Sequence, residues 1–155
     1  MITAWRLIKA RYAANAFDGE GARLYGGRWS SPGFPVVYCS ATASLAVLEV
    51  FANVQRAELL AHYVVVSCAF ERSLVTTVQI EDLAVGWRAS PAPAELKNVG
   101  DDWIRNGASP VLEVPSAIID REKNYLLNPR HPQFERIQLG DPEPFLFDLR
   151  LIERR

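Results

Sequence analysis

The chain of 155 residues has little of what several large classes of protein require. Its two cysteines, Cys39 and Cys68, are far apart in the sequence and lie in apolar runs, so neither a disulfide framework nor a cysteine metal site is expected. No apolar run approaches the roughly 18 residues that span a bilayer, and the N-terminus has no signal-peptide pattern. We therefore expect a single cytoplasmic domain with both cysteines buried and reduced.

An excess of charge of one sign is also lacking. The chain carries 17 Lys and Arg against 18 Asp and Glu, and apart from the terminal pair Arg154-Arg155 the two signs are interspersed. Proteins that bind nucleic acid usually concentrate basic residues on a stripe that neutralises phosphates. Direct binding to DNA, RNA or a membrane is therefore not expected.

Several well-known catalytic and cofactor motifs are missing as well. The two histidines, His62 and His131, are isolated, and no HExxH or clustered carboxylate spacing predicts a metal site. No GxGxxG follows a strand, so a Rossmann-type dinucleotide site is not predicted, and there is no GxSxG elbow. We expect neither a metal nor a resident cofactor.

The apolar residues that are present predict more strand than helix. Alternating and β-branched runs predict strands at 2–9, 36–40, 59–70, 73–78, 110–115, 135–139 and 145–151. Helices are predicted at 43–53, behind a capping Ser40 or Thr42, and at about 91–106. The segment 121–134 is predicted to be a polar loop. Because the βαβ rhythm of parallel α/β folds is absent, the predicted fold class is α+β.

A glycine-rich segment, 13–35, lies between the first two predicted strands. It holds five glycines within 15 positions, which predicts a backbone bent closely around something. Within this segment, Gly26-Gly27-Arg28-Trp29 places a guanidinium in a loop. Arginine suits phosphate groups because its planar fork can bond two oxygens at once, and an ion pair with a surface acid is the alternative for Arg28.

Three further side chains could carry chemistry. Tyr38 is either a core tyrosine or an aromatic plate against a flat ring such as nicotinamide. Glu49 stands among apolar residues of a predicted helix, where a carboxylate is costly unless it is paired, used, or placed at a solvated edge. Ser116 follows a strand, and it either donates a hydrogen bond to a substrate or to Glu49, or acts as a nucleophile with His62 or His131 as its base.

Taken in order and spacing, these motifs resemble the RES domain over nearly the whole chain. The first half of the resemblance consists of the run from Asp18 to Ser30, the segment Pro35-Val36-Val37-Tyr38, and the helix from Ala43 to Glu49. The second half consists of Val114-Pro115-Ser116-Ala117, the segment NYLLNP at 124–129, His131-Pro132, and the ending FDLR at 147–150. The resemblance implies a single RES domain over 1–155.

This resemblance implies a fold and a function. RES domains are similar in fold to ADP-ribosyltransferases, which implies two small β-sheets with a few flanking helices. They are toxins encoded beside an Xre-type antitoxin, and they deplete NAD⁺ by cleaving its nicotinamide–ribose bond. The resemblance therefore implies NAD⁺ as substrate, phosphate or water as acceptor, and an Xre-type antitoxin as partner, with a homodimer as one assembly inside that complex.

The resemblance also assigns roles to residues. The implied catalytic residues are Arg28, Glu49 and Ser116. The expected NAD-binding residues are Arg11, Tyr12, Arg28, Tyr38 and, from the polar loop, Asn128. Nicotinamide leaves as a neutral ring, so one carboxylate, Glu49, can suffice to stabilise the ribosyl cation where glycosidases use two.

Two other functions stay open on the sequence alone. An ADP-ribosyltransferase would pass the same ribosyl carbon to a protein or nucleic acid, since water, phosphate and a side chain attack the same atom. A non-catalytic domain that only binds the antitoxin would be expected to have lost Glu49 or the arginines. A toxin that cleaves RNA is disfavoured by the balanced charge.

Overall fold

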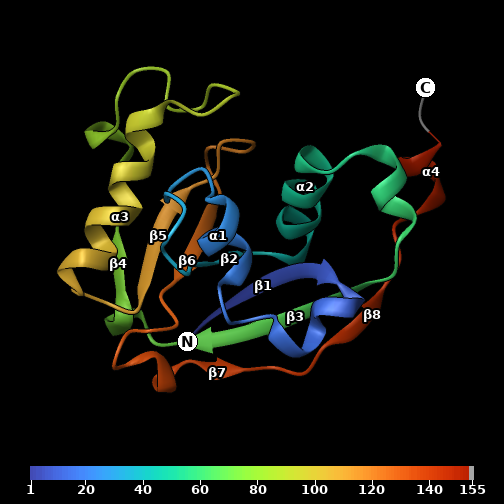
Figure 1. Cartoon of the computed structure of the whole chain (residues 1–155), viewed down its shortest axis with the longest axis horizontal. Helices are drawn as coiled ribbons and strands as arrows, with labels where there is room; N and C mark the ends of the chain where they lie inside the picture. The colour runs from blue at the N-terminus through green and yellow to red at the C-terminus, as the bar shows by residue number, and fades with distance from the viewer. Residues whose placement is uncertain (154–155) are drawn as a thin grey trace.

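The computed structural model describes residues 1–153, and within them it contains one mixed β-sheet with short helices around it (Figure 1). The Arg154-Arg155 pair lies outside the described residues. The strands are β1 Ile2–Lys9, β2 Val37–Ser40, β3 Tyr63–Phe70, β4 Val75–Thr77, β5 Val111–Pro115, β6 Lys123–Leu127, β7 Gln138–Leu139 and β8 Glu143–Phe145. Their order is β4-β5-β6-β2-β1-β3-β7, and β8 also pairs with β3. This arrangement confirms the α+β class, whereas the two separate sheets are not observed.

The single sheet is narrowest between β1 and β2. β1 pairs with β3 from Ile2 to Lys9, but it meets β2 at one register pair, Trp5 with Ser40. Beyond Trp5 the two strands diverge, and the buried guanidinium of Arg6 donates from Nη1 to the Tyr38 carbonyl at 2.9 Å. The sheet therefore has two halves, β4-β5-β6-β2 and β1-β3-β7, that are joined at one point.

The helices cover the sheet in separate places. They are α1 Glu20–Tyr25, α2 Ala43–Asn53, α3 Lys97–Asn106 and α4 Leu149–Ile152, and the short 3₁₀ turns include η1 Ala10–Asn15 and η2 Arg56–Leu60. Trp103 of α3 packs in one apolar cluster with Leu112 of β5 and Leu126 of β6. Ala46 of α2 packs in another with Leu7 of β1. Each half of the sheet thus has its own helix.

Local chemistry explains where the two predicted helices begin and end. Thr42 caps α2, because its Oγ1 accepts a hydrogen bond from the Leu45 N–H at 3.0 Å. Gly107 ends α3 with φ of 61°, a left-handed conformation that glycine adopts without steric cost. The prediction of a helix at 43–53 is confirmed at both ends, and α3 begins later than predicted, behind a short 3₁₀ turn at Ala94–Leu96.

The predicted strand at 59–70 begins only at Tyr63, after a 3₁₀ turn, and the glycine-rich loop contains helix α1. Two further predicted segments are wrong. The supposed polar loop at 121–134 contains β6, whose Leu126 and Leu127 are fully buried because an apolar cluster packs on each face of the strand. Polar residues at both ends of that run hid the strand. The predicted strand at 145–151 ends early: Asp148 Oδ1 accepts the Arg150 N–H at 2.9 Å and starts α4, so Leu149 is exposed rather than half-buried.

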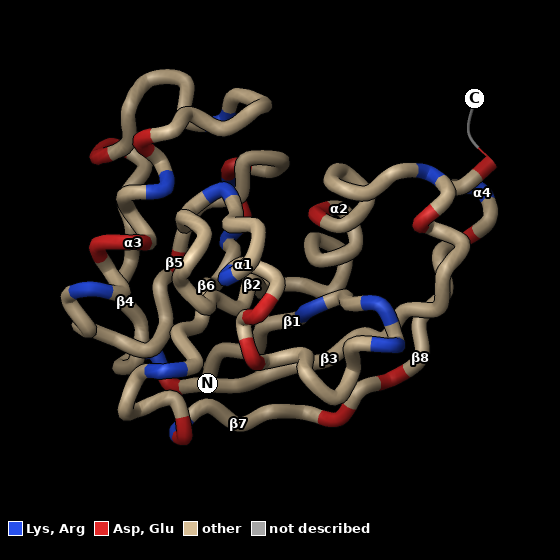
Figure 2. Tube along the Cα trace, in the orientation of Figure 1, with Lys and Arg blue, Asp and Glu red and all other residues tan. Residues whose placement is uncertain are grey.

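Other properties of the described chain bear on the earlier expectations. Cys39 and Cys68 are free and buried, as predicted. Figure 2 shows acidic and basic positions interspersed along the trace. Across residues 1–153, no helix combines the length and the apolar character that crossing a bilayer requires.

Candidate active site

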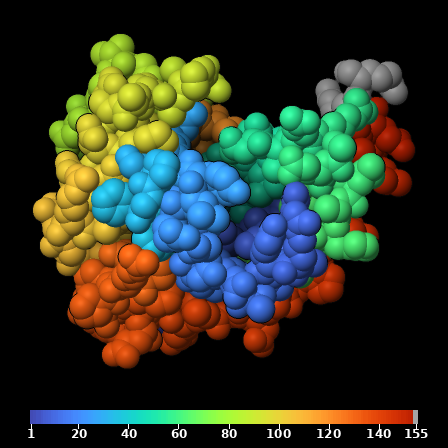
Figure 3. All heavy atoms as spheres, in the orientation of Figure 1, coloured from blue at the N-terminus to red at the C-terminus, as the bar shows by residue number. Residues whose placement is uncertain are grey.

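A hollow opens on the face of the molecule where the two sheet halves meet. In Figure 3 it lies between the lighter blue spheres of α1, the darker blue spheres around η1 and the teal spheres of α2. We call it the α1–α2 hollow. Of the segments that border it, η1 carries the expected Arg11 and Tyr12, and α2 carries Glu49, so three of the predicted site residues lie on segments around the hollow.

Glu49 of α2 is held from β6. Asn124 Nδ2 donates a hydrogen bond to Glu49 Oε2, and Asn124 Oδ1 in turn accepts one from Ser40 Oγ at 2.7 Å. Burial raises the pKa of Glu49, and hydrogen bonds from Asn124 and Ser116 and the charge of Arg28 partly oppose that rise. Glu49 is therefore a partly desolvated carboxylate in a defined orientation, not a side chain on a solvated edge.

Asn124 is a site residue that sequence reasoning did not assign. The sequence pattern predicts a loop at this position, whereas the structure places Asn124 on β6, directly opposite Ser40 of β2. A signal was present, because side chains alternate along a strand and Asn124 shares its face with the buried Leu126. If 123–127 is treated as a strand, Asn124 becomes a polar side chain on a buried face, which marks it as a candidate site residue.

Ser116 is bound in a way that favours a donor role over a nucleophilic one. It is fully buried, and its Oγ accepts hydrogen bonds from the Ile118 N–H at 3.1 Å and the Ile119 N–H at 3.2 Å. A hydroxyl that accepts two hydrogen bonds still has its own proton to donate. Ser116 also counts among the groups that oppose the rise in the Glu49 pKa, which is the effect expected of a donor near that carboxylate.

Neither histidine is placed to act as a base for Ser116. Both ring nitrogens of His131 are engaged at the end of α3, where Nε2 lies 2.9 Å from the Gly107 carbonyl oxygen and Nδ1 accepts the Gln133 N–H at 3.0 Å. His62 precedes β3, and β6, β2 and β1 lie between β3 and β5, a separation of about 19 Å at the usual strand spacing. Neither histidine can therefore serve as the base that a nucleophilic Ser116 would require.

Arg28 extends from the Gly26–Ser30 loop to a turn at 84–89. Its Nη1 donates to the Trp87 carbonyl at 3.1 Å and to the Ala89 carbonyl at 3.0 Å. Among the described residues, no acid forms an ion pair with Arg28, so the surface ion pair considered for it is not observed. Its charge instead acts on Glu49.

Helix α3 binds the backbone of the Arg28 loop. The Gly100 N–H donates to the Trp29 carbonyl at 2.9 Å, and Lys97 Nζ donates to the Gly27 carbonyl. The buried Asp101 accepts two hydrogen bonds from Ser31, from the N–H at 2.8 Å and from the hydroxyl at 2.6 Å. The position of Arg28 is thus determined by a helix some 70 residues later in the chain, which local sequence could not reveal.

Tyr38 of β2 contacts the same loop through its hydroxyl. Its hydroxyl accepts a hydrogen bond from the Trp29 N–H at 3.2 Å and lies 2.8 Å from Ser30 Oγ. A Cβ on Gly27 would lie 2.5 Å from this hydroxyl, so the close approach that the glycines predicted is made to Tyr38. Burial raises the pKa of Tyr38 to about 12. Its stacking on nicotinamide stays a prediction.

Replacing Tyr38 with Phe is expected to lower the free energy of unfolding by about 1–3 kcal/mol, because the buried Trp29 N–H and Ser30 hydroxyl lose a partner. Urea unfolding measures the change. Tyr25→Phe is the matched control, since the Tyr25 side chain is 83% exposed and should change stability little. Equal stability of the two variants would contradict this role of the Tyr38 hydroxyl.

The remaining expected NAD-binding residues divide between the hollow and the far end of β6. The guanidinium carbon of Arg11 lies 4.8 Å from the centre of the Tyr12 ring, and both residues are exposed on η1, which borders the hollow. Asn128 follows the opposite end of β6 from Asn124, about 13 Å away along the strand. Its Oδ1 accepts the Arg130 N–H at 3.0 Å and closes a turn. The structure does not bring Asn128 to the site.

Comparison with known proteins decides the family. The RES domain profile matches residues 3–148. A protein from Yersinia enterocolitica named Toxin Res is 36% identical over 148 residues, which cover 95% of this chain and 97% of that protein. The chain belongs to the RES-domain toxin family. A RES relative from Sphingobium, named Prs ADP-ribosylating toxin, is 31% identical and covers 97% of this chain and 96% of its own length.

Two mycobacterial comparisons complete the relationship. The protein named NAD(+) phosphorylase MbcT from Mycobacterium tuberculosis is 35% identical over 96 residues, or 57% of this RES chain and 50% of that protein. A chain in the crystal structure of the M. tuberculosis MbcT-MbcA toxin-antitoxin complex matches with a TM-score of 0.78 and 21% identity, covering 93% of this chain and 84% of that one. At this identity the structural likeness establishes a shared fold.

A metal site was not expected in this RES protein. In the part of the chain that the structure describes, no three His, Cys, Asp or Glu side chains are grouped so that they could hold a metal ion. Independence from metals and from a resident cofactor stays a prediction.

Proposed function

We propose that this RES-domain toxin cleaves the nicotinamide–ribose bond of NAD⁺ and passes the ADP-ribosyl group to phosphate or water. The observation that carries the proposal is the held carboxylate: Glu49 is partly buried, oriented by Asn124, and under the influence of Arg28 and Ser116. A fixed negative charge of this kind stabilises the cation that develops on the ribosyl carbon. The relative named NAD(+) phosphorylase supports NAD⁺ as the substrate.

The chemistry balances with the residues at hand. The bond from the ribosyl carbon to the pyridinium nitrogen breaks with both electrons going to that nitrogen, so nicotinamide leaves neutral and needs no acid. An oxygen of phosphate or water then forms the new bond to the same carbon. When water is the acceptor, its proton passes to solvent or to Glu49, whose raised pKa suits it to hold a proton.

The arginines would bind the phosphate groups of the substrate. Beyond the Nη1 atom that contacts the 84–89 turn, Arg28 makes no hydrogen bond to described side chains or carbonyls through its other guanidinium nitrogens. Those nitrogens suit the pyrophosphate of NAD⁺ or an incoming phosphate. Arg11 and Tyr12, exposed on η1 beside the hollow, would contact the same substrate.

A macromolecular acceptor is the second candidate, and the Sphingobium relative named as an ADP-ribosylating toxin favours it. The test is to incubate purified protein with NAD⁺, with and without phosphate, and quantify nicotinamide, free ADP-ribose and its phosphorylated form. Release that requires phosphate supports a phosphorylase, and release without it a hydrolase. Label appearing on protein or nucleic acid supports the second candidate. No release from folded protein would contradict the proposal and favour a non-catalytic, antitoxin-binding domain.

The partner of the toxin is also proposed, not established. A structural neighbour that is a toxin–antitoxin complex supports an antitoxin partner, and we propose the Xre type, with the homodimer as one assembly within the complex. Co-expression with an Xre-type protein encoded beside this gene, followed by co-purification and mass measurement, tests the partner and the stoichiometry. A cytoplasmic location stays a prediction.

A further inference from the structure

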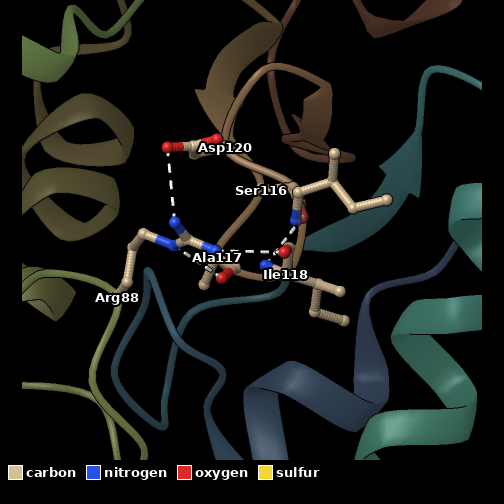
Figure 4. Close-up of polar contacts among 6 residues, drawn as sticks. Arg88, Ser116, Ala117, Ile118 and Asp120 are labelled. Atoms are coloured by element: carbon tan, nitrogen blue, oxygen red, sulfur yellow. Dashed lines mark hydrogen bonds and ion pairs between the residues drawn. The ribbon is translucent and has the colours of Figure 1, made fainter.

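Arg88 is a surface arginine that binds the turn after β5 with its whole guanidinium. Its Nε donates to the Ala117 carbonyl at 2.9 Å, and its Nη2 donates to the Ile118 carbonyl at 3.1 Å. Its Nη1 lies 3.3 Å from Asp120 Oδ2 (Figure 4). All three nitrogens of one side chain therefore contact a single five-residue turn, Ser116–Asp120.

That turn determines how Ser116 is presented. The peptide groups whose carbonyls Arg88 binds belong to the same short stretch whose N–H groups bind Ser116 Oγ. Because a peptide group is planar, fixing the Ala117 carbonyl also fixes the N–H of Ile118, and fixing the Ile118 carbonyl fixes the N–H of Ile119. Both N–H groups donate to Ser116 Oγ, so Arg88 orients the two N–H groups whose hydrogen bonds the Ser116 hydroxyl accepts.

The segment that carries Arg88 also holds the other side of the site. The carbonyls of Trp87 and Ala89, on either side of Arg88, accept hydrogen bonds from Arg28. The Trp87 ring is buried, with its centre 6.1 Å from that of Trp29 in the Arg28 loop. Three consecutive residues thus join the Arg28 loop to the Ser116 turn.

We propose that Arg88 is a positioning residue for the reaction: it holds the Ser116–Asp120 turn so that the Ser116 hydroxyl keeps its proton directed at Glu49. This inference rests on the proposed function for its effect on rate, but not for its effect on the Glu49 carboxylate. Arg88 acts through the turn, because the charged side chain that acts on Glu49 is Arg28, and the other two groups that stabilise its anion are Asn124 and Ser116.

The test compares Arg88→Ala with Arg105→Ala, which also removes an exposed arginine paired with an aspartate. In Arg88→Ala, kcat for nicotinamide release is expected to fall, by at most about 100-fold for a misplacement of this kind, with KM for NAD⁺ little changed. Arg88→Lys should recover only part of the rate, because an ammonium cannot bind two carbonyls and a carboxylate with a fixed fork. Arg105→Ala should match the parent.

A second measurement does not need activity. The titration of the Glu49 carboxyl carbon is followed by NMR in the parent, Ser116→Ala, Arg88→Ala and the double variant. We expect the Glu49 pKa to rise in both single variants, because each loses the hydrogen bond that stabilises the anion. The double variant should show no more than the shift of Ser116→Ala alone, since both changes remove the same interaction. If Arg88→Ala does not fold, Arg88→Lys is titrated instead.

The outcomes separate the two proposals. A parent that releases no nicotinamide contradicts the proposed function, and the titration still decides the role of Arg88. A Glu49 pKa in Arg88→Ala or Arg88→Lys equal to that of the parent overturns the positioning role, as do shifts that add in the double variant. An Arg105→Ala variant that loses as much activity as Arg88→Ala would also overturn it, because any surface arginine would then have the same effect.

Discussion

Glu49→Gln is expected to reduce nicotinamide release from NAD⁺ by about 10²–10³-fold, the usual effect of removing one preorganised electrostatic group. The change removes the negative charge and keeps the size of the side chain, so Asn124 can still donate to the Gln carbonyl oxygen. Nicotinamide release is measured under saturating NAD⁺ with and without phosphate. Glu81→Gln is the matched control, since Glu81 is an exposed acid outside the site. Parent-like activity in Glu49→Gln would show that the site is wrongly assigned.

The same substitution is expected to stabilise the folded protein near neutral pH. Burial raises the pKa of Glu49 in the folded state, so between its ordinary pKa and the raised one the folded state binds more protons than the unfolded state. Stability therefore falls as the pH rises through this window, and the full penalty remains above it. Glutamine carries no such penalty. Thermal midpoints of parent and variant should differ at pH 8 and approach each other below the ordinary Glu pKa; a less stable variant at pH 8 would contradict this account.

Gly100→Ala is expected to disrupt the Arg28 loop. A Cβ at this position would lie 2.1 Å from the Trp29 carbonyl oxygen, which is backbone and already accepts the Gly100 N–H. Either α3 or the loop must move, so we expect a loss of about 3 kcal/mol in the free energy of unfolding. A loop displaced by about 1 Å would also lower activity on the order of 100-fold, because Arg28 would be misplaced.

Gly21→Ala is the matched control for this change. Gly21 lies in helix α1, and a Cβ there would have no neighbour within 4 Å. Alanine is the better helix former, so this variant should be as stable as the parent or more stable by about 0.4–1 kcal/mol. Urea unfolding and nicotinamide release are measured for both variants. If Gly100→Ala behaved like Gly21→Ala, the packing of α3 on the loop would not position Arg28.

Predictions based on local patterns succeeded where local chemistry decides the structure. The helix at 43–53 was predicted from its cap and periodicity, and Thr42 caps it as expected. The strand at 123–127, inside the predicted loop at 121–134, is not apparent from local pattern because the burial of its two faces depends on distant packing, and polar residues flank its apolar centre. The end of β8 was missed because the alternation of apolar residues continues into α4, where Asp148 instead caps a helical turn.

The candidate site divides in the same way. Glu49 could be predicted because an acid within an apolar helix stands out in the sequence, and the glycines before Arg28 indicated a close approach that Tyr38 provides. Asn124 and Arg88 do not stand out in this way, and Asn124 becomes apparent only when 123–127 is treated as a strand. An asparagine in a polar run and an arginine in a turn have ordinary surroundings in sequence, and their partners lie 75 and about 30 positions away.

The two half-sheets that meet at Trp5 and Ser40 draw their strands from interleaved parts of the chain. A break in the backbone between β3 and β4 would leave β1, β2 and β3 on one fragment and β4 to β8 on the other, so both fragments would contribute to both halves. It would also separate Glu49 from Asn124 and Ser116. Neither fragment could build the site alone, which makes this chain suited to a split-enzyme reporter, in which the proposed NAD⁺ cleavage would appear only when two fused partners bring the fragments together.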